Sequence, residues 1–288
     1  MASDPDFTSA VLDAWQGRLD FSQLLSHAGR LSENGQSTLA AVLYQTWLQR
    51  NHTTYNHFAY FNLGVVLSNE NDIPGAKEAY IRAIQLSPDF VHPHFNLGLA
   101  HERLGQIDAA IAEWRWIDDH VSPDQLEHRP LLLLALNGLG RVLEDRKQYF
   151  SALSYLTKSL TLEPHQPDVL HHWVFLREKV CAWPVYTPVA GVSLDLMRES
   201  TSALAMLSLS DDPGAQLAAA RHYVKNKVIS DVPALTPLQP YGHKRLRVGY
   251  CSSDFCIHPV AMLTAELFEL HDREHFDVYG YCWTREGD

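Results

Sequence analysis

The sequence has few basic residues, few cysteines and no long apolar run, and each shortage excludes a class of protein. Lysine and arginine total 23 against 34 aspartate and glutamate residues, a formal net charge of −11. Because nucleic acids and anionic membranes attract basic surfaces, this balance argues against both as partners. No run of about 18 apolar residues is present to cross a bilayer, and the acidic N-terminus MASDPDFTS lacks the apolar region of a signal peptide. The sequence therefore predicts a cytoplasmic protein whose partners are proteins or small molecules.

Metal-binding patterns are also missing. The four cysteines show no CxxC spacing and are too sparse for a disulfide framework, which fits a reducing compartment. The 16 histidines include three close pairs, but no carboxylate or cysteine completes a tetrahedral ligand set at a convincing spacing. We therefore predict no metal site. The pairs are His92 with His94, His171 with His172, and His271 with His275.

What the chain does contain is an internal repeat. The string FNLG occurs twice, and its glycines, Gly64 and Gly98, lie 98 − 64 = 34 residues apart, the period of the tetratricopeptide helix-turn-helix repeat. Small residues at fixed positions let the two helices of a repeat approach closely, and a proline ends the second helix. Residues 57–90 fill every diagnostic position of the repeat. These positions are Tyr60, Leu63, Gly64, Ala76, Tyr80, Ala83 and Pro88.

Further copies extend this pattern in both directions. A second copy spans 91–124 and a third spans 133–166, whose glycine lies 140 − 98 = 42 residues after the second, so a longer connection near SPDQLEHRP precedes it. A closing helix at 167–180 completes an array over 57–180. Residues 1–56 are expected to hold an N-terminal cap and a degenerate opening repeat, because terminal repeats are atypical. The tryptophans at the seams between repeats are predicted to be core residues: Trp47, Trp114 and Trp173.

The second half of the chain has a different character. Residues 181–243 are predicted to form a connector, with one helix over SLDLMRESTSALAMLSL, another around AQLAAARHYVKNKV, and a proline-rich strip that no helix continues through. In residues 244–288, strands at 246–251 and 276–282 flank a helix at 258–272, which predicts one βαβ unit. The loop after its first strand, SSDFCIH, lies at the sheet edge where open α/β sheets bind ligands. The helix carries Val260, Leu263, Leu267 and Leu270 on one face.

The order of repeats, connector and KRLRVGYCSSDFCIHPVAMLTAELFELHDREHFDVYGYC resembles the O-linked N-acetylglucosamine transferases, especially their bacterial relatives of the SPINDLY type. CAWPVY and TSALAMLSLSDDP in the connector share this resemblance. In that family the segment RVGYxSSDFxxHP opens the first lobe of a two-lobed GT-B catalytic domain. The resemblance implies a mainly α fold, a tetratricopeptide superhelix followed by a helical connector and the first βαβ unit of a Rossmann-like lobe.

The resemblance also implies a reaction and its site residues. The activity would be transfer of N-acetylglucosamine from UDP-GlcNAc to protein hydroxyls, although some SPINDLY-type relatives use fucose, and no cofactor or metal is implied beyond the UDP-sugar. His258 would face the catalytic cleft and orient or accept the proton of the acceptor hydroxyl. Ser252, Ser253 and Asp254 would line the same edge. The chain departs from vertebrate-type members at Met262, where those members commonly have a second histidine.

Asn62 and Asn96 occupy the same repeat position. In the resembling family an asparagine there belongs to a ladder on the concave face that holds the backbone of the acceptor protein, because an amide both donates and accepts. The third repeat breaks the ladder, with Gly138 at the equivalent position and Asn137 displaced by one.

Plainer interpretations of these residues stay open. His258 is also placed to cap a helix, the serines and Asp254 to satisfy a turn, and the asparagines to bond locally. By the family's plan the second, nucleotide-binding lobe would follow Asp288, so the 288-residue chain alone is expected to be inactive. The alternative from another class is a non-catalytic tetratricopeptide scaffold for protein–protein interaction.

Overall fold

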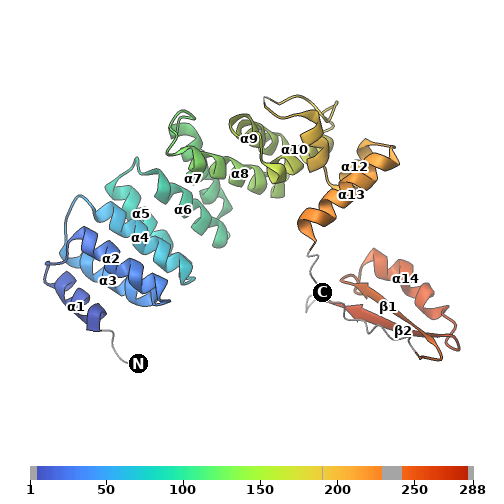
Figure 1. Cartoon of the computed structure of the whole chain (residues 1–288), viewed down its shortest axis with the longest axis horizontal. Helices are drawn as coiled ribbons and strands as arrows, with labels where there is room; N and C mark the ends of the chain where they lie inside the picture. Colours follow the sequence, from blue (N-terminus) through green and yellow to red (C-terminus); the bar gives the residue numbers. More distant parts are fainter. Residues whose placement is uncertain (1–4, 190, 229–241, 285–288) are drawn as a thin grey trace. The chain divides into compact units, whose positions relative to one another are not determined.

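The computed structural model of the chain describes residues 5–189, 191–228 and 242–284 (Figure 1). The chain divides into two compact units, Met1–Val228 and Ile229–Asp288. The proline-rich strip predicted at the end of the connector lies outside the described residues. None of the helices in the described parts of the chain is long and apolar enough to cross a membrane.

The first unit is a stack of antiparallel helix pairs. The three predicted repeats are the pairs α4 with α5, α6 with α7 and α8 with α9, while α2 with α3 makes the degenerate opening repeat and α10 closes the stack. The mainly α repeat fold is therefore confirmed. The helices are α1 (Pro5–Trp15), α2 (Phe21–Glu33), α3 (Ser37–Arg50), α4 (Asn56–Asn69), α5 (Ile73–Leu86), α6 (Val91–Arg103), α7 (Ile107–His120), α8 (Arg129–Asp145), α9 (Tyr149–Leu162) and α10 (Pro167–Lys179).

The third repeat accommodates its longer spacing in two ways. Residues 121–128 form an extended connection outside any helix, and α8 has 17 residues where α4 has 14 and α6 has 13. The first helices of successive repeats still lie side by side, since α4 contacts α6 and α6 contacts α8. The core runs between the helix layers, and the seam tryptophans Trp47, Trp114 and Trp173 are all buried, as predicted.

Glycines in the first helices set the spacing within each repeat. A Cβ at Gly64 would lie 2.5 Å from the Tyr80 ring, and a Cβ at Gly98 would overlap the buried indole of Trp114. A side chain at either position would therefore push the two helices of the repeat apart. Gly29 in α2 is a contrasting case, because a Cβ there meets no atom within 4 Å.

This contrast predicts opposite effects for the same substitution. Gly98→Ala is expected to destabilise the protein by about 1–3 kcal/mol, because the rigid indole of Trp114 has to move. Gly29→Ala is expected to stabilise it by about 0.5–1 kcal/mol, since alanine favours the helix interior. Urea unfolding followed by circular dichroism measures both values. Equal effects of the two substitutions would contradict close packing at Gly98.

The connector differs from the sequence prediction in one respect. The prediction of one helix over SLDLMRESTSALAMLSL is wrong. The segment forms two short helices, α11 (Leu194–Ser200) and α12 (Ala203–Leu209). Thr201 and Ser202 between them are extended, and the Ser202 hydroxyl accepts a hydrogen bond from the Ala205 N–H at 3.0 Å, which starts a new helix. The second predicted helix is α13 (Pro213–Lys227).

The second unit contains the predicted βαβ arrangement. Strand β1 (Leu246–Ser252) pairs in parallel with β2 (Phe276–Cys282), in a register that places Leu246 opposite Phe276, and α14 (Pro259–Glu269) connects them. The apolar face predicted for this helix is exposed within the described residues, because the two strands cover only its other side. The exposed side chains are Val260, Leu263, Leu267 and Leu270.

Candidate functional site

The loop between β1 and α14 holds the four residues assigned to a catalytic edge. His258 is the N-cap of α14, with extended backbone angles, and Pro259 follows at the first helical position. The Nδ1 atom of His258 accepts a hydrogen bond from the Val260 N–H at 3.2 Å. The capping role that the sequence left open for His258 is therefore present in the structure.

The other three residues form a short hydrogen-bonded chain beside it. The Asp254 N–H donates to the Ser252 hydroxyl oxygen at 2.9 Å, and the Ser253 hydroxyl donates to Asp254 Oδ1 at 2.9 Å. The second carboxylate oxygen, Oδ2, lies 3.9 Å from Nδ1 of His258. The loop thus brings a histidine, a carboxylate and two hydroxyls together at the carboxyl edge of the sheet.

This geometry restricts the proton chemistry of His258. While Nδ1 accepts from Val260, the proton of the neutral ring is on Nε2, so Nε2 donates a hydrogen bond and does not accept a proton. Proton acceptance at Nε2 requires the other tautomer, with the proton on Nδ1. The carboxylate of Asp254 lies near Nδ1, but 3.9 Å is too long for a hydrogen bond.

Two residues that sequence reasoning missed hold this loop from the end of β2. The Thr284 hydroxyl donates to the Ser253 carbonyl oxygen at 2.6 Å, and the Trp283 N–H donates to the Ser252 carbonyl oxygen at 3.4 Å. Both contacts join residues about thirty positions apart. The parallel βαβ topology was the available signal, because it places the ends of both strands at one edge.

The asparagine side chains of the three repeats do not form a regular ladder, because their hydrogen-bond partners differ. The side chain of Asn62 makes no hydrogen bond with the described residues, while Nδ2 of Asn96 donates to the Tyr80 hydroxyl at 3.4 Å. Asn137 turns inward, where Nδ2 donates to Gln166 and Oδ1 accepts from Ser159. Among the described residues the amide of Asn62 and the Oδ1 atom of Asn96 therefore have no partner, whereas the amide of Asn137 is used inside the fold.

A cavity of about 300 Å³ lies next to Gly138, where the third repeat lacks the asparagine of the first two repeats. Its walls come from the first helices α6, α8 and α10, and its floor from the buried Trp114 ring, against which Gly138 packs without a side chain. The floor is completed by the buried side chain of Leu156. The other lining residues are Phe95, Leu99, Leu134, Asn137, Arg141, Asp168, Val169 and His172.

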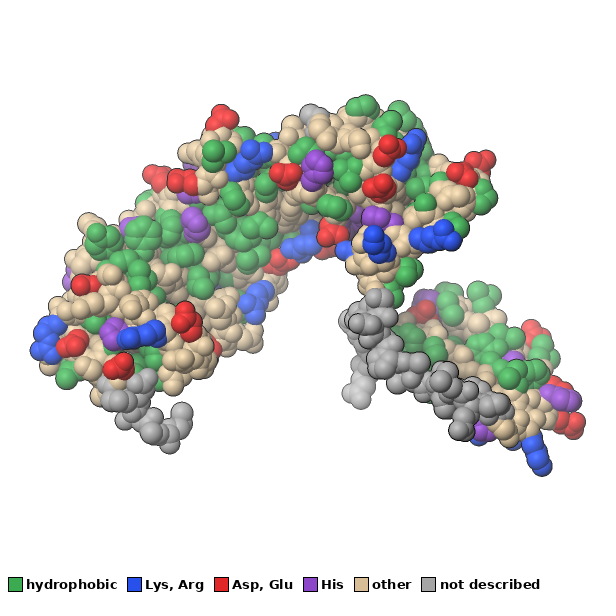
Figure 2. Space-filling view, in the orientation of Figure 1, with side chains coloured by type: hydrophobic (Ala, Val, Ile, Leu, Met, Phe, Trp, Pro, Cys, Tyr) green, Lys and Arg blue, Asp and Glu red, His purple; other side chains and the backbone are tan. Residues whose placement is uncertain are grey.

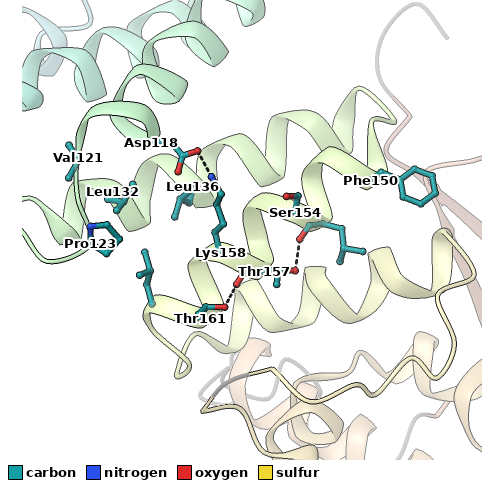
Figure 3. Close-up of a pocket in the computed structure, with 12 residues that line it drawn as sticks. Asp118, Val121, Pro123, Leu132, Leu136, Phe150, Ser154, Thr157, Lys158 and Thr161 are labelled. Atoms are coloured by element: carbon teal, nitrogen blue, oxygen red, sulfur yellow. Dashed lines mark hydrogen bonds and ion pairs between the residues drawn. The ribbon is translucent and has the colours of Figure 1, made fainter.

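A second cavity, of about 700 Å³, opens between α8, α9 and the long connection before α8 (Figure 3). Four of its polar side chains already have partners: Lys158 pairs with Asp118 at 2.6 Å, and Thr157 and Thr161 donate to backbone carbonyls of α9. None of its lining residues comes from α4 or α6, so it is separate from the positions of Asn62 and Asn96.

Several of the paired histidines make hydrogen bonds and ring contacts inside the fold. His94 is buried, stacks on Trp116 at 3.6 Å, and places Nδ1 2.7 Å from Glu113 and Nε2 3.1 Å from the Pro88 carbonyl oxygen. Nδ1 of His171 lies near the Ser200 carbonyl oxygen, and Nδ1 of His172 lies near the Glu144 carboxylate. Within the described parts of the chain, no group of three or more histidine, cysteine, aspartate or glutamate side chains is placed to hold a metal ion.

His92 gives a pH dependence that can be measured. Burial lowers its pKa from the usual 6.5, and the neighbouring His128 lowers it further, against an opposing effect of Glu127. Because the unfolded chain then binds a proton more readily than the folded chain, stability is lost as the pH falls below about 6.5. His92→Phe, which keeps ring contacts with Phe61 and Phe90, is expected to make the loss of Tm between pH 7.5 and 5.5 smaller. Unchanged pH dependence in thermal melts of this variant would contradict the assignment.

Comparison with known proteins finds matches for one segment in each half of the chain. Residues 69–105 match the TPR repeat family, and residues 221–288 match glycosyltransferase family 41. The chain is also 49% identical over 41 residues to a probable UDP-N-acetylglucosamine–peptide N-acetylglucosaminyltransferase, SEC, of Arabidopsis thaliana. That match covers 14% of this chain and 4% of the relative. The resemblance to O-linked N-acetylglucosamine transferases is thereby confirmed.

Similarity to solved structures supports the repeat fold. The crystal structure of YrrB, described as a TPR protein with an unusual peptide-binding site, aligns with a TM-score of 0.50 and 17% identity, over 75% of this chain and 97% of that one. A tetratricopeptide repeat protein from Parabacteroides merdae aligns with a TM-score of 0.51 and 14% identity, over 70% and 72% of the two chains. At these identities the similarity concerns the fold alone.

Proposed function

We propose that the chain is the N-terminal portion of a UDP-GlcNAc-dependent protein O-glycosyltransferase, in which the repeats recognise acceptor proteins and the His258 loop lines the catalytic cleft. The observation that carries this proposal is the family 41 match over residues 221–288, which includes the whole βαβ unit. The loop supports it, since it places an imidazole, a common general base, and a nearby carboxylate together at the carboxyl edge of the sheet.

The repeats supply the second part of the proposal. Neighbouring first helices carry the amide of Asn62 and the Oδ1 atom of Asn96 without partners among the described residues, and such groups suit the alternating donors and acceptors of a polypeptide backbone. Repeat arrays of this type bind extended partners along the surface formed by successive repeats. The acceptor would therefore lie along α4 and α6 as an extended segment.

The proposal is tested on the protein as its own cells produce it. That protein, purified by an affinity tag placed before Met1, is expected to transfer radiolabelled GlcNAc from UDP-GlcNAc to proteins of the cell extract. Label transferred from GDP-fucose instead would change the donor but keep the enzyme class. Failure with both donors, together with retention of extract proteins by the repeats, would favour the non-catalytic scaffold.

The 288-residue chain by itself is expected to show no turnover with UDP-GlcNAc. The reason is that one βαβ unit provides only two strands, whereas a GT-B enzyme closes two complete lobes on its nucleotide sugar. The measurement is release of UDP from UDP-GlcNAc, in the presence of cell-extract proteins, with the tagged native protein as the positive control. Turnover by the isolated chain would contradict the expectation.

A further inference from the structure

We propose that the third repeat has an apolar pocket at the position where the first two repeats carry an asparagine. The polypeptide bound by the repeats inserts one large apolar side chain into this pocket. The pocket is the 300 Å³ cavity floored by Trp114 and Leu156. The inference rests on the proposed acceptor-binding function and adds a specificity to it. The preferred occupant is leucine, isoleucine, methionine or phenylalanine in an extended segment.

The pocket exists because of the residue at the ladder position. Gly138 stands where the first two repeats carry Asn62 and Asn96. A Cβ at Gly138 would lie only 3.1 Å from the six-membered ring of Trp114, so any side chain there would cover the indole. Glycine at this position therefore leaves the space beside the buried indole open, on the face that elsewhere carries asparagines.

The polar groups around the pocket are already paired with other parts of the chain. Arg141 donates two hydrogen bonds to the Glu102 carboxylate, at 2.5 and 2.8 Å, and the imidazole of His172 lies 3.0 Å from Glu144. Asp168 pairs with Lys227 at 2.7 Å. The indole N–H at the floor and the amide of Asn137 also have partners.

These pairings determine which side chain the pocket favours. A charged or polar occupant would lose its hydration beside groups that already have partners, which is unfavourable. An apolar occupant gains by leaving water, and the walls offer it Leu99, Leu134 and Val169. The volume of about 300 Å³ is enough for one large side chain.

A polypeptide fits this surface better than an isolated apolar molecule. Asn62 and Asn96 lie on the first helices that precede α8 in the stack, and α6 contributes both Asn96 and the pocket wall at Leu99. A chain held by its backbone at the amides continues to the pocket. Backbone contacts then supply affinity and the pocket supplies sequence preference, a division common in peptide recognition.

The test is a selection of random 12-residue peptides on the full 288-residue chain. Peptides retained by the wild type are expected to be enriched in large apolar residues at one position, and Leu134→Asp is expected to weaken these peptides about tenfold or more in fluorescence anisotropy. Leu134 is 50% exposed, so the substitution leaves the helix core intact. Leu126→Asp, at a 75% exposed leucine outside the pocket, is the matched control and is expected to bind like the wild type.

The possible outcomes distinguish failure of the pocket from failure of the proposed acceptor-binding function. Peptides that bind the wild type without apolar enrichment, or that bind Leu134→Asp as tightly, would overturn the pocket while leaving polypeptide binding by the repeats in place. Gly138→Asn provides a second variant, expected to retain peptides but to lose the enrichment. Absence of any retained peptide would overturn the acceptor-binding proposal and the pocket with it.

Discussion

Replacing Trp114 with alanine is expected to destabilise the repeat stack by about 3–5 kcal/mol. Trp114 is completely buried and fills the space between Gly98 of its own repeat and Gly138 of the next. Alanine would leave a cavity at a junction that no neighbouring side chain is large enough to close. Because one indole joins two repeats, the loss affects both the second and the third repeat.

The measurement is thermal unfolding, in which a 1 kcal/mol change corresponds to a Tm shift of about 2–4 °C in a domain of this size. Trp15→Ala is the matched control. Trp15 is half-exposed and contacts the Arg50 guanidinium at 3.6 Å, so its loss is expected to cost only about 0.5–1 kcal/mol. A Tm for Trp114→Ala within a degree of that control would contradict the central position assigned to Trp114.

The repeats could be predicted because their signal is local. Gly64, Gly98 and the small residues that follow recur at a fixed spacing, and each pair of helices packs mainly against its neighbours in sequence. The βαβ unit was equally accessible, because two strand patterns flank one helix pattern. The break at Thr201 was missed, since a serine that caps a new helix is indistinguishable in sequence from a serine inside one.

The details of the sites depend on contacts that no local pattern records. Asn137 is turned inward by Gln166 and Ser159, each more than twenty residues away. The pocket under Gly138 needs the Trp114 ring, which belongs to the preceding repeat. The sequence indicated that the ladder is broken at Gly138, but only the packing of Trp114 shows that the gap is apolar.

In the native-length protein, His258→Ala is expected to lower kcat for GlcNAc transfer by about 10²–10⁴ if His258 handles the proton of the acceptor hydroxyl. His258 also caps α14, so part of any loss in this variant would come from structure, because replacing an N-cap by alanine costs about 0.5–2 kcal/mol. A second variant has to separate the two contributions.

His258→Asn makes that separation. Asparagine is among the best N-cap residues, so it keeps α14 in place, but its amide does not accept a proton at neutral pH. A chemical role predicts that His258→Asn also loses about 10²–10⁴ in kcat although it keeps the cap, while KM for the acceptor stays near the wild-type value. His275→Ala, at an exposed histidine paired only with Asp272 among the described residues, is the control and is expected to remain within about twofold in kcat. Recovery of activity in His258→Asn would instead show that capping α14 is the whole contribution of this residue.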